Sequence, residues 1–475
     1  MTWLWTTEEM IAAMAGRPVG TLPEGVTGIS IDSRSVAPGE AFFAIKGDRV
    51  DGHDYASYAM ANGAALLVVA EAKLPALGRL TVPMIVVEDV LAALRRLGSA
   101  ARARSGAKIV AVTGSVGKTT TKEMLRAVLS PSGSLHASVA SFNNHWGVPV
   151  TLARMPRETD FGIFEIGMNH PGEIRPLVQL VRPHVAIITN IAGAHMGNFN
   201  SIEEIAAAKA EIFDGVTPDG HAILNRDNEQ YEFLEKAARA AHVPHIHSFG
   251  QHEAADFQLA EFVGQAESST AWVSLDGEPA ELAIGVPGRH IAENALAALC
   301  VASIVGADLN LAIAALQDLK AVKGRGQRHR LALPGGAFTL IDDSYNANPA
   351  SMRAAISVLA AATPEGEGRR IAVLGDMLEM GEHAEKVHAE LADPILAAGI
   401  EHVWLAGPEM QALKAALPEN VETVYCAATE ELARFALGAI HPGDVLVVKS
   451  SLGTGFGKIV AALLDKYPAF SDTDR

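Results

Sequence analysis

The chain has 475 residues, of which 49% are hydrophobic and 20% are charged, and its formal net charge is −17. At about 150 residues per domain, this length predicts three domains of ordinary globular composition. The acidic balance argues against a protein that binds duplex nucleic acid, which needs a basic surface. It still allows an anionic substrate that is held by local basic residues.

Cysteine usage and the N-terminus indicate the compartment. Cys300 and Cys426 are the only cysteines, which excludes a disulfide framework and a Cys-rich zinc module. Glu8 and Glu9 stand where a signal peptide needs positive charge. No apolar run approaches the roughly 18 residues that a membrane-spanning helix requires. We therefore expect a cytoplasmic protein with no stable membrane insertion.

The first part of the chain, residues 1–105, alternates short apolar runs with polar turns. Its pattern predicts strands at 41–45 and 84–87, and helices at 54–62 and 89–102. This alternation is typical of a small α/β domain. The basic, Ala-rich stretch from Arg95 to Lys108 reads as a linker or a helix that leads into the next domain.

A strand, a glycine-containing loop and a helix then follow one another. The apolar run Ile109–Thr113 leads into a loop that ends in Gly117, Lys118 and Thr119. Glycines let backbone N–H groups turn toward phosphate oxygens, and the next helix presents its positive end. Lys118 can reach the β- and γ-phosphates, and the Thr119 hydroxyl can coordinate Mg²⁺. Two residues instead of the usual four separate the glycines, but the structural context favours a nucleotide site over a plain turn.

The middle part, residues 106–323, continues this alternation. Predicted strands lie at 162–166, 185–189 and 222–224, and predicted helices at 202–213 and 291–305. Strand–helix alternation predicts a mostly parallel sheet with helices on both faces. Residues 254–281 alternate polar and apolar side chains, which predicts a small antiparallel excursion.

Glycines and positive charge between Lys320 and Arg330 interrupt the pattern, and we place the second domain boundary there. The last part, residues 324–475, again alternates strands and helices, with predicted strands at 338–341, 370–374, 402–405 and 445–449. It predicts a Rossmann-like domain. Its first strand lacks a Gly-x-Gly-x-x-Gly turn, so we do not expect it to bind a dinucleotide.

Three residues of the middle part are candidates for chemistry. Glu165 ends a predicted strand, where a carboxylate is well placed to hold Mg²⁺, unless it is only a solvated strand end. His195 follows another strand and could bind a metal or a phosphate, although a lone histidine is more often structural. Lys209 lies in a predicted helix, where composition alone favours a solvated lysine.

Three further candidates come later in the chain. Asn294 could contact a base edge or cap the start of a helix. Arg325 lies between two glycines at the presumed boundary, which suits an anion clamp that arrives when domains close. Asp343 lies in a cluster of short polar residues, Asp342 to Pro349, that follows a strand, which is typical of a binding loop or of an ordinary Asx turn.

The chain carries the phosphate loop Thr-Gly-Ser-Val-Gly-Lys-Thr at 113–119 together with six further motifs: Asp32-Ser-Arg34, residues 46–53, 143–149, 165–173, 343–349 and 375–381. Together they resemble the Mur ligase family of ATP-dependent amide-forming enzymes, over essentially the whole chain. Several of the motifs resemble those of the members that add D-alanyl-D-alanine. The loop of that family reads Thr-Gly-(Ser/Thr)-x-Gly-Lys-Thr, so its short glycine spacing is expected.

The resemblance implies a ligase of peptidoglycan synthesis, expected to be monomeric, that joins D-alanyl-D-alanine to UDP-N-acetylmuramoyl-tripeptide through an acyl phosphate. It implies a uridine-nucleotide domain at 1–105, an ATP-binding domain at 106–323 and a domain on the D-alanyl-D-alanine side at 324–475. The third peptide residue, lysine or diaminopimelate, stays open.

The same resemblance implies roles for individual residues. The residues implied to contact the substrate are Ser33, Arg34, Lys46 and Asn144. The nucleotide is held by Gly114, Ser115, Val116, Gly117, Lys118, Thr119 and Thr120, with Asn294 at the adenine and with Arg325 and Asp343 at the hinge. Thr119 and Glu165 bind one Mg²⁺, and His195 binds a second; Lys209 occupies a position that is often carbamylated. The implied catalytic residues are Lys118, Asn144, His195, Lys209 and Arg325.

One departure and two alternatives accompany this resemblance. Relatives tend to have Lys-Gly-Ser after the last strand, whereas this chain has Lys449-Ser450-Ser451, which leaves the backbone less free to approach a ligand. A sibling Mur or folylpolyglutamate-type ligase that adds a single amino acid is the nearest alternative. A phosphate-loop switch is the other, but the nucleotide domain lacks an Asn-Lys-x-Asp base-specificity motif.

Overall fold

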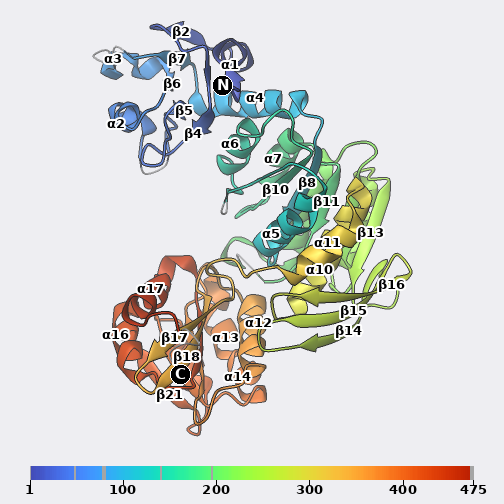
Figure 1. Cartoon of the computed structure of the whole chain (residues 1–475), viewed down its shortest axis with the longest axis vertical. Coiled ribbons are helices and arrows are strands. Elements are labelled where there is room, and N and C mark those ends of the chain that lie inside the picture. Colours follow the sequence, from blue (N-terminus) through green and yellow to red (C-terminus); the bar gives the residue numbers. More distant parts are fainter. Residues whose placement is uncertain (1, 48–49, 78–81, 140–141, 194–195, 471–475) are drawn as a thin grey trace.

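The computed structural model describes residues 2–47, 50–77, 82–139, 142–193 and 196–470. Three successive α/β regions, each built on its own large sheet, follow the sequence from the blue to the red end of Figure 1. The α/β fold class is therefore confirmed. No helix among the described residues is long and apolar enough to cross a membrane.

The N-terminal region contains a five-stranded sheet in the order β2-β7-β6-β5-β4, which is parallel except for β2, and a two-stranded ribbon of β1 and β3. Its strands are β1 (Trp5–Thr6), β2 (Arg17–Val19), β3 (Gly25–Val26), β4 (Gly28–Ser30), β5 (Glu40–Phe43), β6 (Leu66–Ala70) and β7 (Met84–Val87). Its helices are α1 (Thr7–Met14), α2 (Ala56–Ala61), α3 (Leu74–Leu77) and α4 (Val90–Arg104). The predicted helix at 54–62 is a 3₁₀ turn that continues into α2.

Helix α4 joins this region to the next one. Asp89 caps its start, accepting a hydrogen bond from the Ala92 N–H at 2.6 Å. The helix extends to Arg104, so most of the stretch predicted as a linker or helix is helical and packs against α6. Arg102 is buried and donates from Nε to the Val181 carbonyl at 2.8 Å. These contacts fix the N-terminal sheet against the middle region.

The middle region contains a nine-stranded sheet in the order β16-β15-β14-β13-β12-β11-β8-β10-β9. Its strands are β8 (Lys108–Thr113), β9 (Leu135–Ala137), β10 (Phe161–Glu165), β11 (Val185–Ile188), β12 (His221–Asn225), β13 (His245–Gly250), β14 (Phe257–Gly264), β15 (Ser269–Leu275) and β16 (Glu278–Ile284). Its helices are α5 (Lys118–Leu129), α6 (Gly147–Ala153), α7 (Ile174–Val181), α8 (Ile202–Ala210), α9 (Tyr231–Ala240), α10 (Arg289–Val305) and α11 (Leu309–Gln317).

Side-chain alternation along β8 explains the layers of this region. Val110 and Val112 point into a core with α5, α10 and α11, whereas Ile109 and Ala111 point into a core with α6 to α9. The predicted parallel sheet with helices on both faces is therefore confirmed. The predicted antiparallel excursion is also present, but β14 pairs in parallel with β13, so β14 to β16 extend the main sheet.

The C-terminal region contains a six-stranded sheet in the order β17-β18-β22-β19-β20-β21, parallel except for the β17–β18 hairpin. Its strands are β17 (Gln327–Leu333), β18 (Gly336–Asp343), β19 (Arg370–Gly375), β20 (His402–Ala406), β21 (Glu422–Cys426) and β22 (Val445–Lys449). Its helices are α12 (Pro349–Ala360), α13 (Ala384–Ala389), α14 (Ala392–Ala397), α15 (Met410–Ala416), α16 (Thr429–Ala439) and α17 (Gly457–Lys466).

Two edge strands of this sheet differ from the sequence prediction. Residues 327–330, which the sequence placed in a glycine-rich break, begin β17, and β21 was not predicted. Both are edge strands whose side chains are partly open to solvent, so they carry polar residues and lack a clear apolar run.

Candidate functional site

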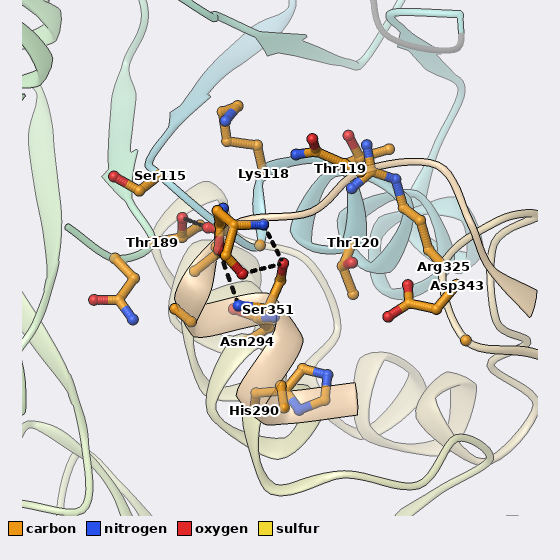
Figure 2. A pocket seen from close by; sticks show the side chains of 18 of the residues that line it. Ser115, Lys118, Thr119, Thr120, Thr189, His290, Asn294, Arg325, Asp343 and Ser351 are labelled. Carbon is orange, nitrogen blue, oxygen red and sulfur yellow. Dashed lines mark hydrogen bonds between the residues drawn. The ribbon is translucent and has the colours of Figure 1, made fainter. Parts of the chain in front are cut away.

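A cavity of about 390 Å³ lies between the middle and C-terminal regions. The middle region contributes residues 115–117 of the phosphate loop, the ends of β10 and β11 and the start of α10; the C-terminal region contributes Arg325, Asp343, Lys449 and α12. Figure 2 shows labelled side chains of both regions around this space. Its position at the carboxyl ends of parallel strands is the usual binding position in α/β sheets.

The phosphate loop has the backbone shape of an anion cradle. Gly114 and Gly117 have φ values of 151° and 86°, and a Cβ at Gly114 would lie 2.0 Å from Thr189 Oγ1. The Ser115 N–H donates to the Asn190 carbonyl at 2.8 Å, which fixes the loop to the end of β11. No described side chain caps α5, whose N-cap is Gly117. Its first N–H groups are therefore available to an anion at the positive end of the helix.

Lys118 begins α5 and lines the cavity. Its Nζ donates to the Gly114 carbonyl at 2.6 Å. Burial lowers the pKa of Lys118, the charge of Arg325 lowers it further, and Glu165 opposes both. A strong anion in the cavity would replace lost solvation and favour the ammonium form.

Glu165 is held by two partners at the end of β10. Its Oε2 accepts the Thr119 hydroxyl at 2.9 Å, and its Oε1 accepts the Asn143 amide at 2.8 Å. Within the described part of the chain, no group of three or more His, Cys, Asp or Glu side chains could hold a metal ion. One carboxylate with one hydroxyl fits Mg²⁺, which keeps several waters and shares substrate phosphates.

Lys209 is buried, with 1% of its surface exposed, on the inner face of α8. The interpretation as a solvated helix lysine is therefore wrong. Burial, together with the nearby charge of Lys118, holds the pKa of Lys209 well below its ordinary value. An uncharged amine at this position can act as a nucleophile, which a solvated lysine at neutral pH rarely does.

Asn294 lies in the second turn of α10 and packs against the phosphate loop. A Cβ at Gly117 would lie 3.1 Å from its Oδ1. The helix begins at Arg289 with Gly288 as its N-cap, so the alternative that Asn294 caps the helix is wrong. The nearly buried amide faces the cavity from beside the loop, as Figure 2 shows.

The C-terminal wall gathers opposite charges. Asp343 accepts the Lys449 ammonium at 2.7 Å, and the Arg325 guanidinium lies over the Tyr345 ring, 4.7 Å from its centroid. Burial raises the pKa of Asp343, while Lys449 and Arg325 oppose the increase. The Asx turn that the sequence offered as an alternative is made by Asp342, which accepts the Ser344 N–H at 3.2 Å. Asp343 itself lines the cavity.

Several residues that the sequence assigned to the site do not line the cavity or lie outside the described residues. Ser33, Arg34 and Lys46 belong to the N-terminal region and do not line this cavity. Asn144 also does not line it; its Oδ1 accepts the Gly147 N–H at 2.9 Å, at the start of α6. His195 lies outside the described residues. Of the segment 114–120, which the sequence assigned to the nucleotide, Gly114 does not line the cavity. The remaining six residues do: Ser115, Val116, Gly117, Lys118, Thr119 and Thr120.

Sequence reasoning missed several residues that line the cavity, among them Asn143, His290, Tyr345 and Lys449. Lys449 could have been found from the sequence, because it ends an apolar strand as Glu165 does. No sequence pattern singles out His290. Its ring is open to the cavity, but the surrounding protein removes bulk water, and this effect with the charge of Lys449 lowers the pKa of His290 to about 4. His290 is therefore a neutral hydrogen-bonding group at neutral pH.

Three family models together match most of the chain. They are the Mur ligase family catalytic domain at residues 25–102, the Mur ligase middle domain at 112–302, and the Mur ligase glutamate ligase domain at 324–452. The chain belongs to the Mur ligase family.

Within the family, the chain is similar to proteins named UDP-N-acetylmuramoyl-tripeptide–D-alanyl-D-alanine ligase. That of Escherichia coli is 35% identical over 92% of this chain and 93% of its own length, and that of Bacillus subtilis is 33% identical over 93% of each. A crystal structure of MurF from Acinetobacter baumannii matches with a TM-score of 0.84 and 30% identity, covering 97% of this chain and 99% of its own. MurF of Thermotoga maritima, solved with ADP, matches with a TM-score of 0.75 and 26% identity, covering 92% and 96%.

Proposed function

We propose that this chain is an ATP-dependent ligase that joins D-alanyl-D-alanine to UDP-N-acetylmuramoyl-tripeptide. The observation that carries the proposal is the shared cavity, where the phosphate loop with Lys118 faces Arg325 and the Asp343–Lys449 pair across a region boundary. Relatives of that printed name match over nearly the whole chain. The product is the UDP-linked pentapeptide used in peptidoglycan synthesis.

In the first step, the terminal carboxylate of the tripeptide attacks the γ-phosphorus of ATP; the bond from this phosphorus to ADP breaks, and an acyl phosphate and ADP result. Anions must approach one another, so the site has to offset their repulsion. Lys118 and Arg325 carry the positive charge, and the N–H groups at the start of α5 add the dipole of the helix. The low-solvent setting that lowers the pKa of Lys118 also strengthens its attraction to phosphate.

In the second step, the free amine of D-alanyl-D-alanine attacks the acyl carbonyl. The amide forms, inorganic phosphate leaves and a proton is released. The C-terminal region would present the dipeptide, because it forms the wall opposite the phosphate loop. Closure of this wall would align the amine and exclude water from the acyl phosphate.

Mg²⁺ would be held by Thr119 and Glu165, where it would neutralise phosphate charge during transfer. Asn143 holds the other carboxylate oxygen of Glu165 and so fixes the direction of the ligand. We assign Lys209 as the site of a carbamate: a neutral amine adds to CO₂ and releases a proton, which gives a carboxylate-like group. The low pKa of Lys209 supports this assignment. His195 is assigned to a second metal by resemblance alone.

We also propose the domain division 1–105, 106–323 and 324–475, with the UDP substrate, ATP and D-alanyl-D-alanine as the respective ligands. The three separate sheets and the three matched ranges support it. Ser33, Arg34, Lys46 and Asn144 are the proposed substrate contacts. Gly47, next to Lys46, lies against Trp146, since its Cβ would be 2.9 Å from Trp146 Cη2. The proposed substrate loop therefore contacts the middle region near Asn144.

The test is phosphate release with all three substrates, comparing the unaltered chain with Lys118→Ala. We expect release that requires both UDP-muramyl-tripeptide and D-alanyl-D-alanine, and a loss of at least about 100-fold in the variant. Single amino acids in place of the dipeptide test for a sibling ligase, and nucleotide turnover without any amine tests for a switch. Undiminished ligation by Lys118→Ala would refute the proposed role of the loop.

A further inference from the structure

Lys122 is a fully buried lysine, 0% exposed, to which neither the sequence motifs nor the proposed mechanism gives a task. It follows Lys118 by four residues on α5, so both side chains leave the same face of the helix. Burying an ammonium is costly unless partners replace its water. The groups that surround Lys122 therefore indicate its role.

The Lys122 ammonium lies between three elements. Its Nζ donates to the Ser138 carbonyl at 3.0 Å, next to the end of β9, and lies 3.1 Å from Glu123 Oε1 on α5. It also lies 3.9 Å from Glu165 Oε2 at the end of β10. The Ser138 side chain also holds Glu165, because its Oγ accepts the Glu165 backbone N–H at 3.3 Å.

Glu165 is thus surrounded by groups that favour one orientation of its carboxylate. Asn143 holds Oε1, the Thr119 hydroxyl holds Oε2, and the Lys122 ammonium faces Oε2 from the interior. An ammonium beside a carboxylate attracts it and opposes its rotation away. We infer that Lys122 is a positioning residue: it keeps the Glu165 carboxylate directed toward the Mg²⁺ site. This inference rests on the proposed function.

A purely structural role is the competing explanation, in which Lys122 only anchors α5 to its neighbours. Glu123 separates the two explanations, because it is the nearest carboxylate to Lys122 and does not contact the site. Glu123 is partly exposed and also pairs with Arg126 at 3.6 Å. Removing the Glu123 charge disturbs the anchor of Lys122 and leaves Glu165 and its three partners in place.

The experiment measures binding of a non-hydrolysable ATP analogue by calorimetry over a series of Mg²⁺ concentrations. The unaltered chain, Lys122→Met and the control Glu123→Gln are compared. We expect Lys122→Met to raise the Mg²⁺ concentration at half-saturation by about 10- to 100-fold, as for other partners that orient metal ligands, and Glu123→Gln to leave it unchanged. An unchanged Mg²⁺ dependence in Lys122→Met overturns the inference. Failure of the unaltered chain to bind the analogue would instead refute the proposed nucleotide site.

If Lys122→Met folds poorly, the melting temperatures of Lys122→Met, Glu165→Gln and the double variant replace the binding measurement. Loss of the ammonium leaves the Glu165 charge buried without its cation, so neutralising Glu165 in the same chain should restore much of the lost stability. Additive losses in the double variant would show that the two charges are not coupled, and would overturn the inference.

Discussion

Lys118, in the cavity wall, and the neighbouring Lys209 are unlike surface lysines. Lys118 and Lys209 are close enough for the charge of one to lower the pKa of the other, and burial lowers both. Two ammonium groups this close, without anions between them, would repel each other, so one of them is expected to lose its proton first. The larger effect falls on Lys209, which lies deeper than Lys118 and is 1% exposed. Lys118, which lines the cavity, is therefore the cation for phosphate, and Lys209, which does not line it, is a neutral amine nearby.

The neutral amine leads to a prediction on Lys209. If it carries a carbamate, ligation by the unaltered chain should fall in CO₂-depleted buffer and return when bicarbonate is added. Lys209→Met should lose about 10- to 100-fold of the activity and should not respond to bicarbonate. Phosphate release with all substrates present measures both effects. Equal rates with and without bicarbonate in the unaltered chain would contradict the assignment.

At the scale of elements, the strands of the middle sheet have different chemistry at their two ends. Polar groups of the site lie at the carboxyl ends, as with Glu165 at the end of β10. At the amino ends of β12 and β13, three histidines meet instead. The His221 ring stacks on His245 with centroids 4.7 Å apart, and its Nδ1 lies 3.0 Å from His247 Nε2. Burial and then the two neighbouring rings lower the pKa of His221 to about 4.

This cluster predicts that stability depends on pH. An unfolded histidine binds its proton near pH 6.5, whereas folded His221 binds it near pH 4. Between these values the unfolded state holds more protons, so the stability contribution is complete above about pH 6.5 and is lost as the pH falls toward 4. His221→Gln should flatten the fall in melting temperature over this range, and His441→Gln, at an exposed position, should not. An unchanged pH profile in His221→Gln would contradict the argument.

Elements with local signals could be predicted from the sequence, and those defined by distant contacts could not. The run Ile109–Thr113 with the following glycines predicts β8, the loop and α5, because strand, turn and helix preferences agree over adjacent residues. Glu165 could be predicted since strand ends gather at one edge. Lys122 and Lys209 could not, because their burial depends on elements that pack from elsewhere in the chain. The contact of Asn294 with Gly117 joins α10 to α5 and leaves no local pattern.

At the scale of the whole molecule, a second contact besides the cavity joins the middle and C-terminal regions. The Gly197 N–H, in the 3₁₀ turn Met196–Asn198, donates to the Glu379 carbonyl at 2.8 Å. Glu379 and Gly381 have φ values of 64° and 57°, so the turn that carries the carbonyl is in the left-handed region. Ser451 supports this turn, since its Oγ accepts the Leu378 N–H at 3.0 Å. The 375–381 motif thus serves a contact between regions.

This contact predicts a selective effect of Gly381→Ala. A Cβ there would lie 2.8 Å from Gly197 Cα, whereas Gly399, with φ of 61°, has nothing within 4 Å of an added Cβ. Both alanine variants carry about 1–2 kcal/mol of backbone strain, but only Gly381→Ala also separates the regions. We expect Gly381→Ala to lower kcat by about 5- to 30-fold and to increase the radius of gyration measured by X-ray scattering with ligands bound. Equal behaviour of the Gly399→Ala control would contradict this explanation.

The position of Arg325 in the connecting segment has a consequence for inhibitors. Gly324 and Gly326, both at positive φ, flank it, and the chain passes from one region to the other through these residues. The Gly326 N–H donates to the Asp342 carbonyl at 2.8 Å and the Gly324 carbonyl accepts the Tyr345 N–H at 3.1 Å, so the turn that follows β18 lies beside this pivot. If the C-terminal region swings about it, Arg325 and Asp343 travel through short arcs. A compound held by the phosphate loop, Arg325 and Asp343 would therefore tolerate many degrees of opening, and its residence time would depend little on how long the enzyme stays shut.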